Sequence, residues 1–392
     1  MLTQKQKDKI DEKKAAMPKA LQRDNEANYK EGYFFITLNT REEVPAFGCV
    51  EGHIGGQKTD MPHMRYSELG EKVMANWESI PRYHPQVELI AAEVMPEHFH
   101  GLLYLSPDGT EHLGRIVNGF MIACTHAYWD ILGIAWRDMK KDLTKGERAA
   151  AHEWQDNSHT HSYRGPAVFV RGYNDVIPIT EKDVQTKIEY IHTQAEKRLI
   201  KGNNALCFDI HRGQRSCHWS KETALNAILK DTFFRNNAAA CEEAKQKVTE
   251  RLLDGLDWVG SKELLLCARK LPLVCHRADI NLFEQQKEAV LAAAQDGAVI
   301  VSAFISSKER EIRDLLFAAQ IPVIEIMDNG FSERYKPYGK AFYACAENKL
   351  VQISPWKYLY QRESKISREM CLVMNELSLT ICQCGDDWWK DL

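Results

Sequence analysis

The chain has 392 residues, of which 44% are hydrophobic and 27% are charged, and this composition excludes collagen-like, low-complexity and wholly disordered proteins. Its net charge of −4 gives no support to a broadly basic nucleic-acid-binding protein, so such a function has to be argued from motifs. Thirteen of the 14 histidines lie between His53 and His218, which directs the search for chemistry to the first part of the chain.

Residues 1–30 are rich in charged side chains and contain no apolar run, which predicts a mobile charged tail rather than a signal peptide. No stretch approaches the roughly 18 apolar residues of a membrane span, so we expect no membrane partner. The 11 cysteines include no C-x-x-C pair, and a chain of this length does not depend on disulfides. We therefore expect reduced thiols and a cytoplasmic protein.

From residue 31 to residue 202, strand and helix patterns follow one another. Strands are predicted over residues 33–39, 87–95, 99–105 and 168–170, with a further strand or hairpin in the glycine-rich run 48–56. Helices are predicted over residues 67–80, where Pro81 ends the pattern, over 112–135 and over 180–200, and residues 137–160 form a charged helix or loop. This order is typical of an α+β domain with antiparallel strands.

The second half of the chain has a different pattern. Residues 203–260 are polar and helical, which predicts a connector. From residue 261 to residue 392, short apolar strands alternate with helices, which predicts a parallel sheet of the α/β class. The strands are expected over 271–275, 298–301, 321–326 and 350–353, and the helices over 281–295, 308–319, 339–346 and 366–382.

Two histidines stand at alternate positions at the start of a predicted strand. Because successive side chains of a strand point to opposite faces, His98 and His100 project to one side while Phe99 faces the other. Two imidazoles placed in this way can reach one cation. Taken alone, a His-x-His pair is more often two polar residues on an outward strand face, so its meaning depends on its surroundings.

The surrounding run VELIAAEVMPEHFHGLLYL, residues 87–105, resembles the paired strands of the single-tyrosine HUH transposases, especially those associated with repetitive extragenic palindromes. That family has a Met-Pro-Asn-His-x-His segment, in which Glu97 replaces the asparagine here. The upstream run SELGEKVMANWESIPRYHPQVEL is similar to the helix and strand that precede the motif. The resemblance covers roughly residues 30–200 and implies an HUH nuclease fold for residues 31–202.

A second segment, from Ile188 to Gln194, resembles the Tyr-Ile-x-x-Asn-Pro segment of the same family. The resemblance implies that Tyr190 is the nucleophile and that Gln194 supplies an amide oxygen as a third metal ligand beside the two histidines. Gln194 stands where the family has asparagine, and Ala195 where it has proline. On one continuous helix, Tyr190 and Gln194 share a face. Without the histidine pair, Tyr190 would be interpreted as a half-buried helix tyrosine.

The resemblance implies a single-stranded DNA endonuclease and strand transferase that uses Mg²⁺ or Mn²⁺ and a covalent 5′-phosphotyrosine. Its partners would be single-stranded or hairpin DNA and a second copy of the chain. Arg137, Lys140 and Lys141 belong to the only notable basic cluster near this domain, and we expect them to bind DNA. The acidic residues among them favour a solvated helix as the alternative.

The run from Asp296 to Trp356 resembles the Rossmann-like fold of DNA-processing proteins of the DprA type, and the resemblance covers roughly residues 262–385. Ser306 and Glu309 have capping-box spacing, but neither G-x-G-x-x-G nor a P-loop is present, so no cofactor is assigned to this half. Two alternative functions remain. One is a non-catalytic DNA-binding regulator that keeps the fold, and the other is a nucleotide-binding enzyme whose activity lies in the C-terminal domain.

Overall fold

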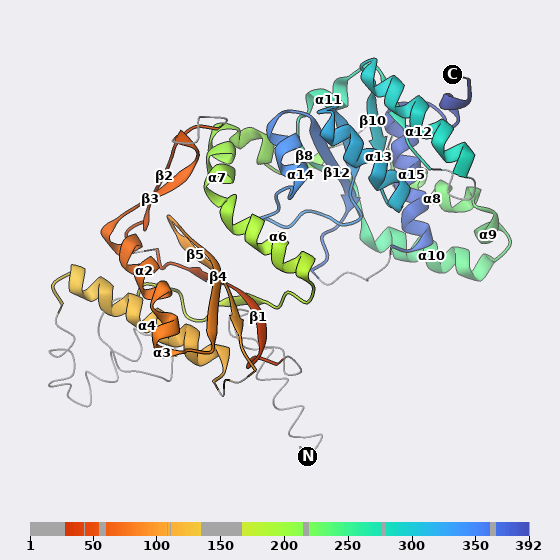
Figure 1. Ribbon diagram of the computed structural model, residues 1–392. Helices are drawn as coiled ribbons and strands as arrows, with labels where there is room; N and C mark the ends of the chain where they lie inside the picture. Colours follow the sequence, from red (N-terminus) through yellow and green to blue (C-terminus); the bar gives the residue numbers. More distant parts are fainter. Residues whose placement is uncertain are drawn as a thin grey trace, which may run out of the picture. The chain divides into compact units, whose positions relative to one another are not determined.

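The computed structural model describes residues 28–42, 44–54, 60–107, 109, 111–134, 167–214, 219–275, 280–360 and 366–391. The chain divides into two compact units, Met1–Ile200 and Lys201–Leu392 (Figure 1). Each unit has a sheet and a hydrophobic core of its own, and the whole is a mixed α+β structure. Within the described residues, we find no helix with both the length and the apolarity that crossing a bilayer requires.

The first unit is built on an antiparallel sheet of four strands in the order β4-β5-β1-β6. These strands are β1 (Gly32–Asn39), β4 (Val87–Met95), β5 (His98–Leu105) and β6 (Asn174–Val176). The glycine-rich run forms a separate hairpin of β2 (Gly48–Glu51) and β3 (His63–Tyr66). The strand predicted over residues 168–170 is wrong, because Phe169 makes only an isolated bridge to Thr40.

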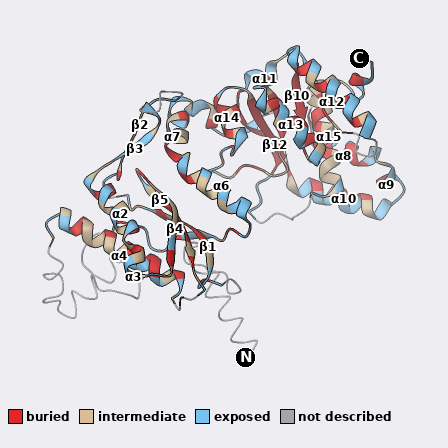
Figure 2. Ribbon diagram, viewed as in Figure 1, coloured by how far each residue is buried: buried red, intermediate tan, exposed pale blue. Residues whose placement is uncertain are grey.

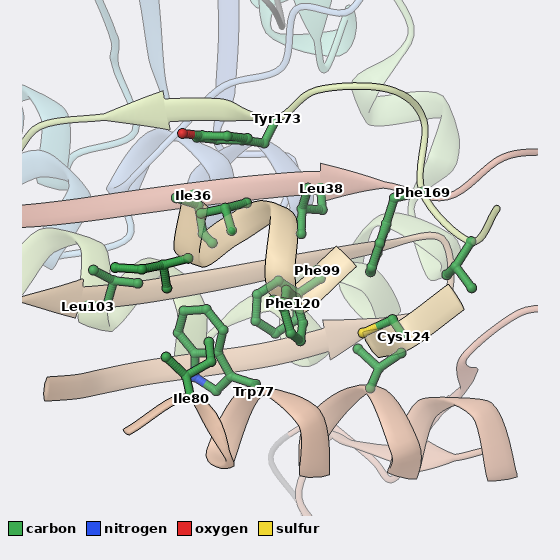
Figure 3. Close-up of a cluster of buried hydrophobic side chains, with 14 of the residues drawn as sticks. Ile36, Leu38, Trp77, Ile80, Phe99, Leu103, Phe120, Cys124, Phe169 and Tyr173 are labelled. Carbon is green, nitrogen blue, oxygen red and sulfur yellow. The ribbon is translucent and has the colours of Figure 1, made fainter. Parts of the chain in front are cut away.

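One face of this sheet is covered by α2 (Glu68–Glu78), α3 (Ile80–Tyr83) and α4 (Leu113–Ile131). The sequence predicted that Pro81 ends a helix. In the structure it lies in the first turn of α3, where its missing N–H costs no hydrogen bond. The aromatic rings of Trp77, Phe99 and Phe120 interlock in this core (Figure 3). Gly101 allows this packing, because a Cβ there would lie 2.6 Å from the Trp77 ring.

The opposite face of the sheet is covered by α6 (Glu181–His192), which lies against β4 and β5. Its start is fixed by a capping box in which Thr180 accepts from the Asp183 N–H and the Asp183 carboxylate accepts from the Thr180 N–H. The Thr180 hydroxyl also donates to this carboxylate and lowers the pKa of Asp183. α7 (Gln194–Asn203) follows, so the single helix predicted over residues 180–200 is in fact two helices.

The second unit is built on a sheet of six strands in the order β7-β8-β12-β11-β10-β9. The four strands β9 (Lys270–Pro272), β10 (Val299–Ser302), β11 (Val323–Ile326) and β12 (Leu350–Trp356) are parallel, which confirms the predicted parallel sheet. Figure 2 shows that β10 and β12 are coloured mainly as buried.

The helices of this unit pack on both faces of the sheet. They are α8 (Lys221–Lys230), α9 (Thr232–Arg235), α10 (Ala238–Arg251), α11 (Glu263–Leu266), α12 (Ile280–Gln295), α13 (Ser307–Ala318), α14 (Lys340–Ala346), α15 (Arg368–Cys382) and the 3₁₀ turns η3 (Ala205–Phe208) and η4 (Trp388–Asp391).

The connector predicted over residues 203–260 is wrong. This stretch contains β7 (His211–Gln214) and β8 (Leu252–Gly260), and β8 pairs antiparallel with β12 inside the second unit. Asp254 and Asp257 interrupt the apolar pattern of β8, so the sequence pattern does not predict a strand there. Asp257 is nevertheless buried. Its carboxylate is satisfied by the Arg212 guanidinium at 2.6 Å and by the Gly213 N–H at 2.9 Å, which makes its burial tolerable.

Candidate functional site

The two histidines lie on the sheet face that α6 covers. His98 and His100 are separated by one residue on β5, and their ring centroids are 4.7 Å apart. Phe99 between them belongs to the core on the opposite face, as strand alternation requires. His100 is 4% exposed, so its ring is held among protein atoms instead of lying on an open surface.

The neighbouring strand β1 fixes the orientation of His100. Thr37 is the residue of β1 paired with His100, and its Oγ1 lies 3.0 Å from the His100 Nδ1. Phe35, two residues earlier on the same face, stacks on the His100 ring at 5.2 Å between centroids. When Nδ1–H donates to Thr37, the imidazole lone pair is on Nε2, which is the tautomer of a metal-ligating histidine held by a second residue.

Helix α6 brings Tyr190 to the same place. Val184, Ile188 and Ile191 recur at helical spacing and pack with Phe35 and Leu102 of the sheet. This packing sets Tyr190 at the end of α6 with its ring centroid 5.2 Å from that of His100. The Tyr190 ring also meets the edge of Phe35 at 5.8 Å. The structure therefore brings together His98, His100 and Tyr190, which are up to 92 residues apart in the chain.

Gln194 lies across a helix break from Tyr190, so the two residues do not share one continuous helix as predicted. Its side chain is buried, and its Nε2 donates to the Tyr190 carbonyl at 3.0 Å rather than to either histidine. The Thr193 hydroxyl donates to the Glu189 carbonyl at 2.7 Å. These side-chain bonds to the last carbonyls of α6 compete with helix continuation, which explains the break.

The donor set of the site is the two imidazoles, while the Gln194 amide is hydrogen-bonded to the Tyr190 carbonyl. Within the described ranges, no group of three or more His, Cys, Asp and Glu side chains is arranged to hold a metal ion. The Thr37 contact and the burial of His100 fit a metal-ligating histidine, and two imidazoles leave coordination positions for oxygen ligands. The pair thus fits a divalent cation that shares its remaining positions with an amide, water or substrate oxygens.

A half-buried carboxyl group lies on the same face. Glu93 of β4 is the residue paired with His100 on the other side of β5, and Tyr66 donates to its Oε1 at 2.9 Å. Burial raises the pKa of Glu93, and burial together with the Glu93 charge raises the pKa of Tyr66. No sequence pattern points to either residue, because Glu93 lies beside His100 only through the pairing of β4 with β5, and Tyr66 reaches Glu93 from β3.

Helix α7 is tied to the turn that precedes the histidines. Arg198 of α7 forms an ion pair with Glu97, and the Glu97 carbonyl accepts from the Thr40 N–H at 3.0 Å. Arg198 and Gln194 are four residues apart in α7, so they share a helix face. Glu97, the residue that differs from the resembled family, therefore connects the histidine strand to the helix after Tyr190.

Arg137, Lys140 and Lys141, which we expect to bind DNA, lie outside the described residues. In the second unit, the Cys207 Sγ donates to the Asn348 side chain at 3.3 Å, and His211 stacks on Trp258 at 3.9 Å between ring centroids.

No protein-family model matches the chain. A stretch of 77 residues is 36% identical to an uncharacterized protein of Haemophilus influenzae, and the match covers 19% of this chain. The chain spans 38% of the length of that relative.

Two solved structures are similar over less than half of this chain. The first is a REP-associated tyrosine transposase bound to a REP hairpin, with a TM-score of 0.26 and 18% identity, covering 45% of this chain and 74% of that one. The second is a putative transposase from Deinococcus radiodurans R1, with a TM-score of 0.23 and 14% identity, covering 44% of this chain and 98% of that one. Because both TM-scores lie below 0.5, the function has to be inferred from the residues of this chain.

Proposed function

We propose that the first unit is a metal-dependent single-stranded DNA endonuclease and strand transferase of the HUH single-tyrosine type. The observation that carries the proposal is the assembly of His98, His100 and Tyr190 on one sheet face, with successive ring centroids 4.7 Å and 5.2 Å apart. A tyrosine hydroxyl is a weak nucleophile in isolation, so its placement beside a cation site is what phosphoryl chemistry requires.

In the proposed reaction, the Tyr190 Oη forms a bond to the phosphorus of a phosphodiester, and the bond from phosphorus to the 3′ oxygen breaks. The phenol loses one proton and the leaving 3′ oxygen gains one, so protons balance over the step. The product is a 5′-phosphotyrosine and a free 3′-hydroxyl. Because the covalent bond conserves the phosphodiester, attack by another 3′-hydroxyl can rejoin a strand without ATP.

His98 and His100 would hold Mg²⁺ or Mn²⁺, with Gln194 as the third protein ligand, and Thr37 would orient His100. A divalent cation at this place supplies electrostatic stabilisation of the charge on the phosphate oxygens. The aromatic contacts of Phe35 with His100 and Tyr190 hold both rings and limit water around the nucleophile.

For the second unit, the parallel strands β9 to β12 support a Rossmann-like fold of the DprA type, and we assign it no ligand. The substrate of the whole chain would be single-stranded or hairpin DNA. The homodimer and the DNA contacts of Arg137, Lys140 and Lys141 stay predictions.

The first prediction tests the nucleophile. The full chain is incubated with a labelled library of DNA hairpins carrying random single-stranded flanks, with and without Mn²⁺, and protein-linked label is measured on a denaturing gel. We expect a covalent adduct that requires Mn²⁺ and disappears on chelation. Tyr190→Phe should abolish the adduct and leave DNA binding intact, because it removes only the hydroxyl.

Tyr104→Phe is the matched control, because Tyr104 lies on β5 near the end remote from the histidines and its ring contacts that of Tyr33. This variant should keep the adduct. An adduct that persists in Tyr190→Phe overturns the assignment of the nucleophile. DNA binding by the wild-type chain without any adduct would instead favour the non-catalytic regulator.

A further inference from the structure

Two lysines lie against the aromatic side chains at the proposed nucleophile. The Lys187 Nζ of α6 is 4.9 Å from the centroid of the Phe35 ring, and the Lys197 Nζ of α7 is 5.5 Å from the centroid of the Tyr190 ring. Both side chains are half-buried. Contacts with ring faces hold the two ammonium groups beside the site, whereas a solvated lysine on a helix samples many directions.

Lys187 has an acidic neighbour on its own helix, whereas Lys197 is followed by an arginine that is already in an ion pair. Asp183 is one helical turn before Lys187, and the charge of Lys187 contributes to lowering the pKa of Asp183. Next to Lys197 in the chain, Arg198 is paired with Glu97. Lys197 lies over the ring of the proposed nucleophile itself, so its ammonium group is close to the place where a phosphate bonded to Tyr190 would lie.

We infer that Lys187 and Lys197 bind the phosphate backbone of a single DNA strand next to the phosphate that Tyr190 attacks. This inference rests on the proposed function and adds the residues that hold the substrate at its site. Lysine binds phosphate as a compact point charge, so the contacts are independent of base sequence. With a net charge of −4, the chain depends on such local cations to bind DNA.

The two lysines differ in their expected effects on the reaction. The Lys187 ammonium group contacts the Phe35 ring and not the ring of the nucleophile, so we expect it to contribute to binding of the strand. Lys197 is beside the nucleophile, so it contributes to binding and also to the rate at which the phosphotyrosine forms.

The experiment measures the affinity of the full chain for fluorescein-labelled dT20 between 50 and 200 mM KCl, in the Tyr190→Phe background so that no adduct forms. Lys187→Met and Lys197→Met keep the apolar stem and remove the charge. For single strands, each phosphate contact contributes about 0.7 to the slope of log affinity against log salt. Each variant should therefore make this negative slope shallower by about 0.7 and lower the affinity at 50 mM salt by about 5–10-fold.

Lys182→Met is the matched control, because Lys182 is exposed in the first turn of α6. It should leave the slope unchanged, and Lys187→Arg and Lys197→Arg should restore it. If the parent protein binds dT20 and both methionine variants keep its slope, the inference is wrong while the nuclease proposal stands.

A second readout uses the wild-type tyrosine and the hairpin library. Lys197→Met should slow adduct formation at saturating DNA by about tenfold or more, a typical effect of losing one charge-stabilising group. Lys187→Met should leave that saturated rate unchanged. A complete absence of adduct in the wild-type chain would overturn the proposed function, whereas the dT20 titration tests the lysines independently of it. Equal rates in the wild type and Lys197→Met contradict the second role of Lys197.

Discussion

At the scale of single residues, the site depends on side chains that hold the histidines as much as on the histidines. Thr37 contacts the His100 Nδ1, and Phe35 stacks on the same ring. Both come from β1, more than 60 residues before His100. A ligand whose second nitrogen is fixed in this way loses less freedom when it binds a cation, so the strength of a metal site depends on such contacts.

Thr37→Val tests this dependence, because valine keeps the shape of threonine and cannot bond to the His100 Nδ1. We expect the affinity for Mn²⁺, measured by electron paramagnetic resonance titration of the full chain, to fall about 10–100-fold. Thr37→Ser keeps the hydroxyl and should stay close to the wild type. Equal affinities in Thr37→Val and the wild type would show that this hydroxyl does not support a metal ligand.

At the scale of elements, the position of a strand or helix depends on the side chains that it packs against. α6 carries apolar residues at helical spacing, so its position on the sheet follows from Val184, Ile188 and Ile191. β8 has no such regular pattern. It is the antiparallel neighbour of β12, and Arg212 and Gly213 make its place in the sheet tolerable by satisfying the buried carboxylate of Asp257.

Two aspartates of β8 give a matched pair of substitutions. Asp257→Ala should lower the free energy of unfolding by about 1–3 kcal/mol, because it removes the charged acceptor of hydrogen bonds from Arg212 and from the Gly213 N–H. Asp254→Ala removes an exposed ion pair with Lys221 and should change stability by no more than about 0.5 kcal/mol. Urea unfolding followed by tryptophan fluorescence measures both. Equal effects would contradict the burial of Asp257.

At the scale of the whole molecule, the chain joins two units with separate cores and no excess of positive charge. A protein of this kind has no broad field that attracts DNA of any sequence, so binding depends on local contacts. The proposed site accordingly lies where the histidine pair of β5 meets two lysines of α6 and α7.

We therefore expect weak binding to random duplex DNA by the full chain. A titration of a random-sequence duplex against salt should give a slope no steeper than about −2.7, which corresponds to about three phosphates in B-form DNA. Fluorescence anisotropy over the same salt range as for dT20 measures it. A slope of about −6 or steeper would reveal a large basic surface and would contradict the view that contacts are local.

The sequence by itself determined the features that depend on neighbours along the chain. Strand alternation placed His98 and His100 on one face and Phe99 on the other. The regular alternation of strands and helices after residue 261 predicted the parallel sheet. These predictions succeed because residues close in sequence follow the geometry of a single element.

Only the tertiary structure decided which elements meet. It set Thr37 and Phe35 against His100, Lys187 and Lys197 against the aromatic rings, and β8 beside β12. It also divided the expected helix after Tyr190, because side chains there bond to its last carbonyls. The physical reason is that strand pairing and side-chain contacts join residues far apart in the chain, and no local pattern records those partners.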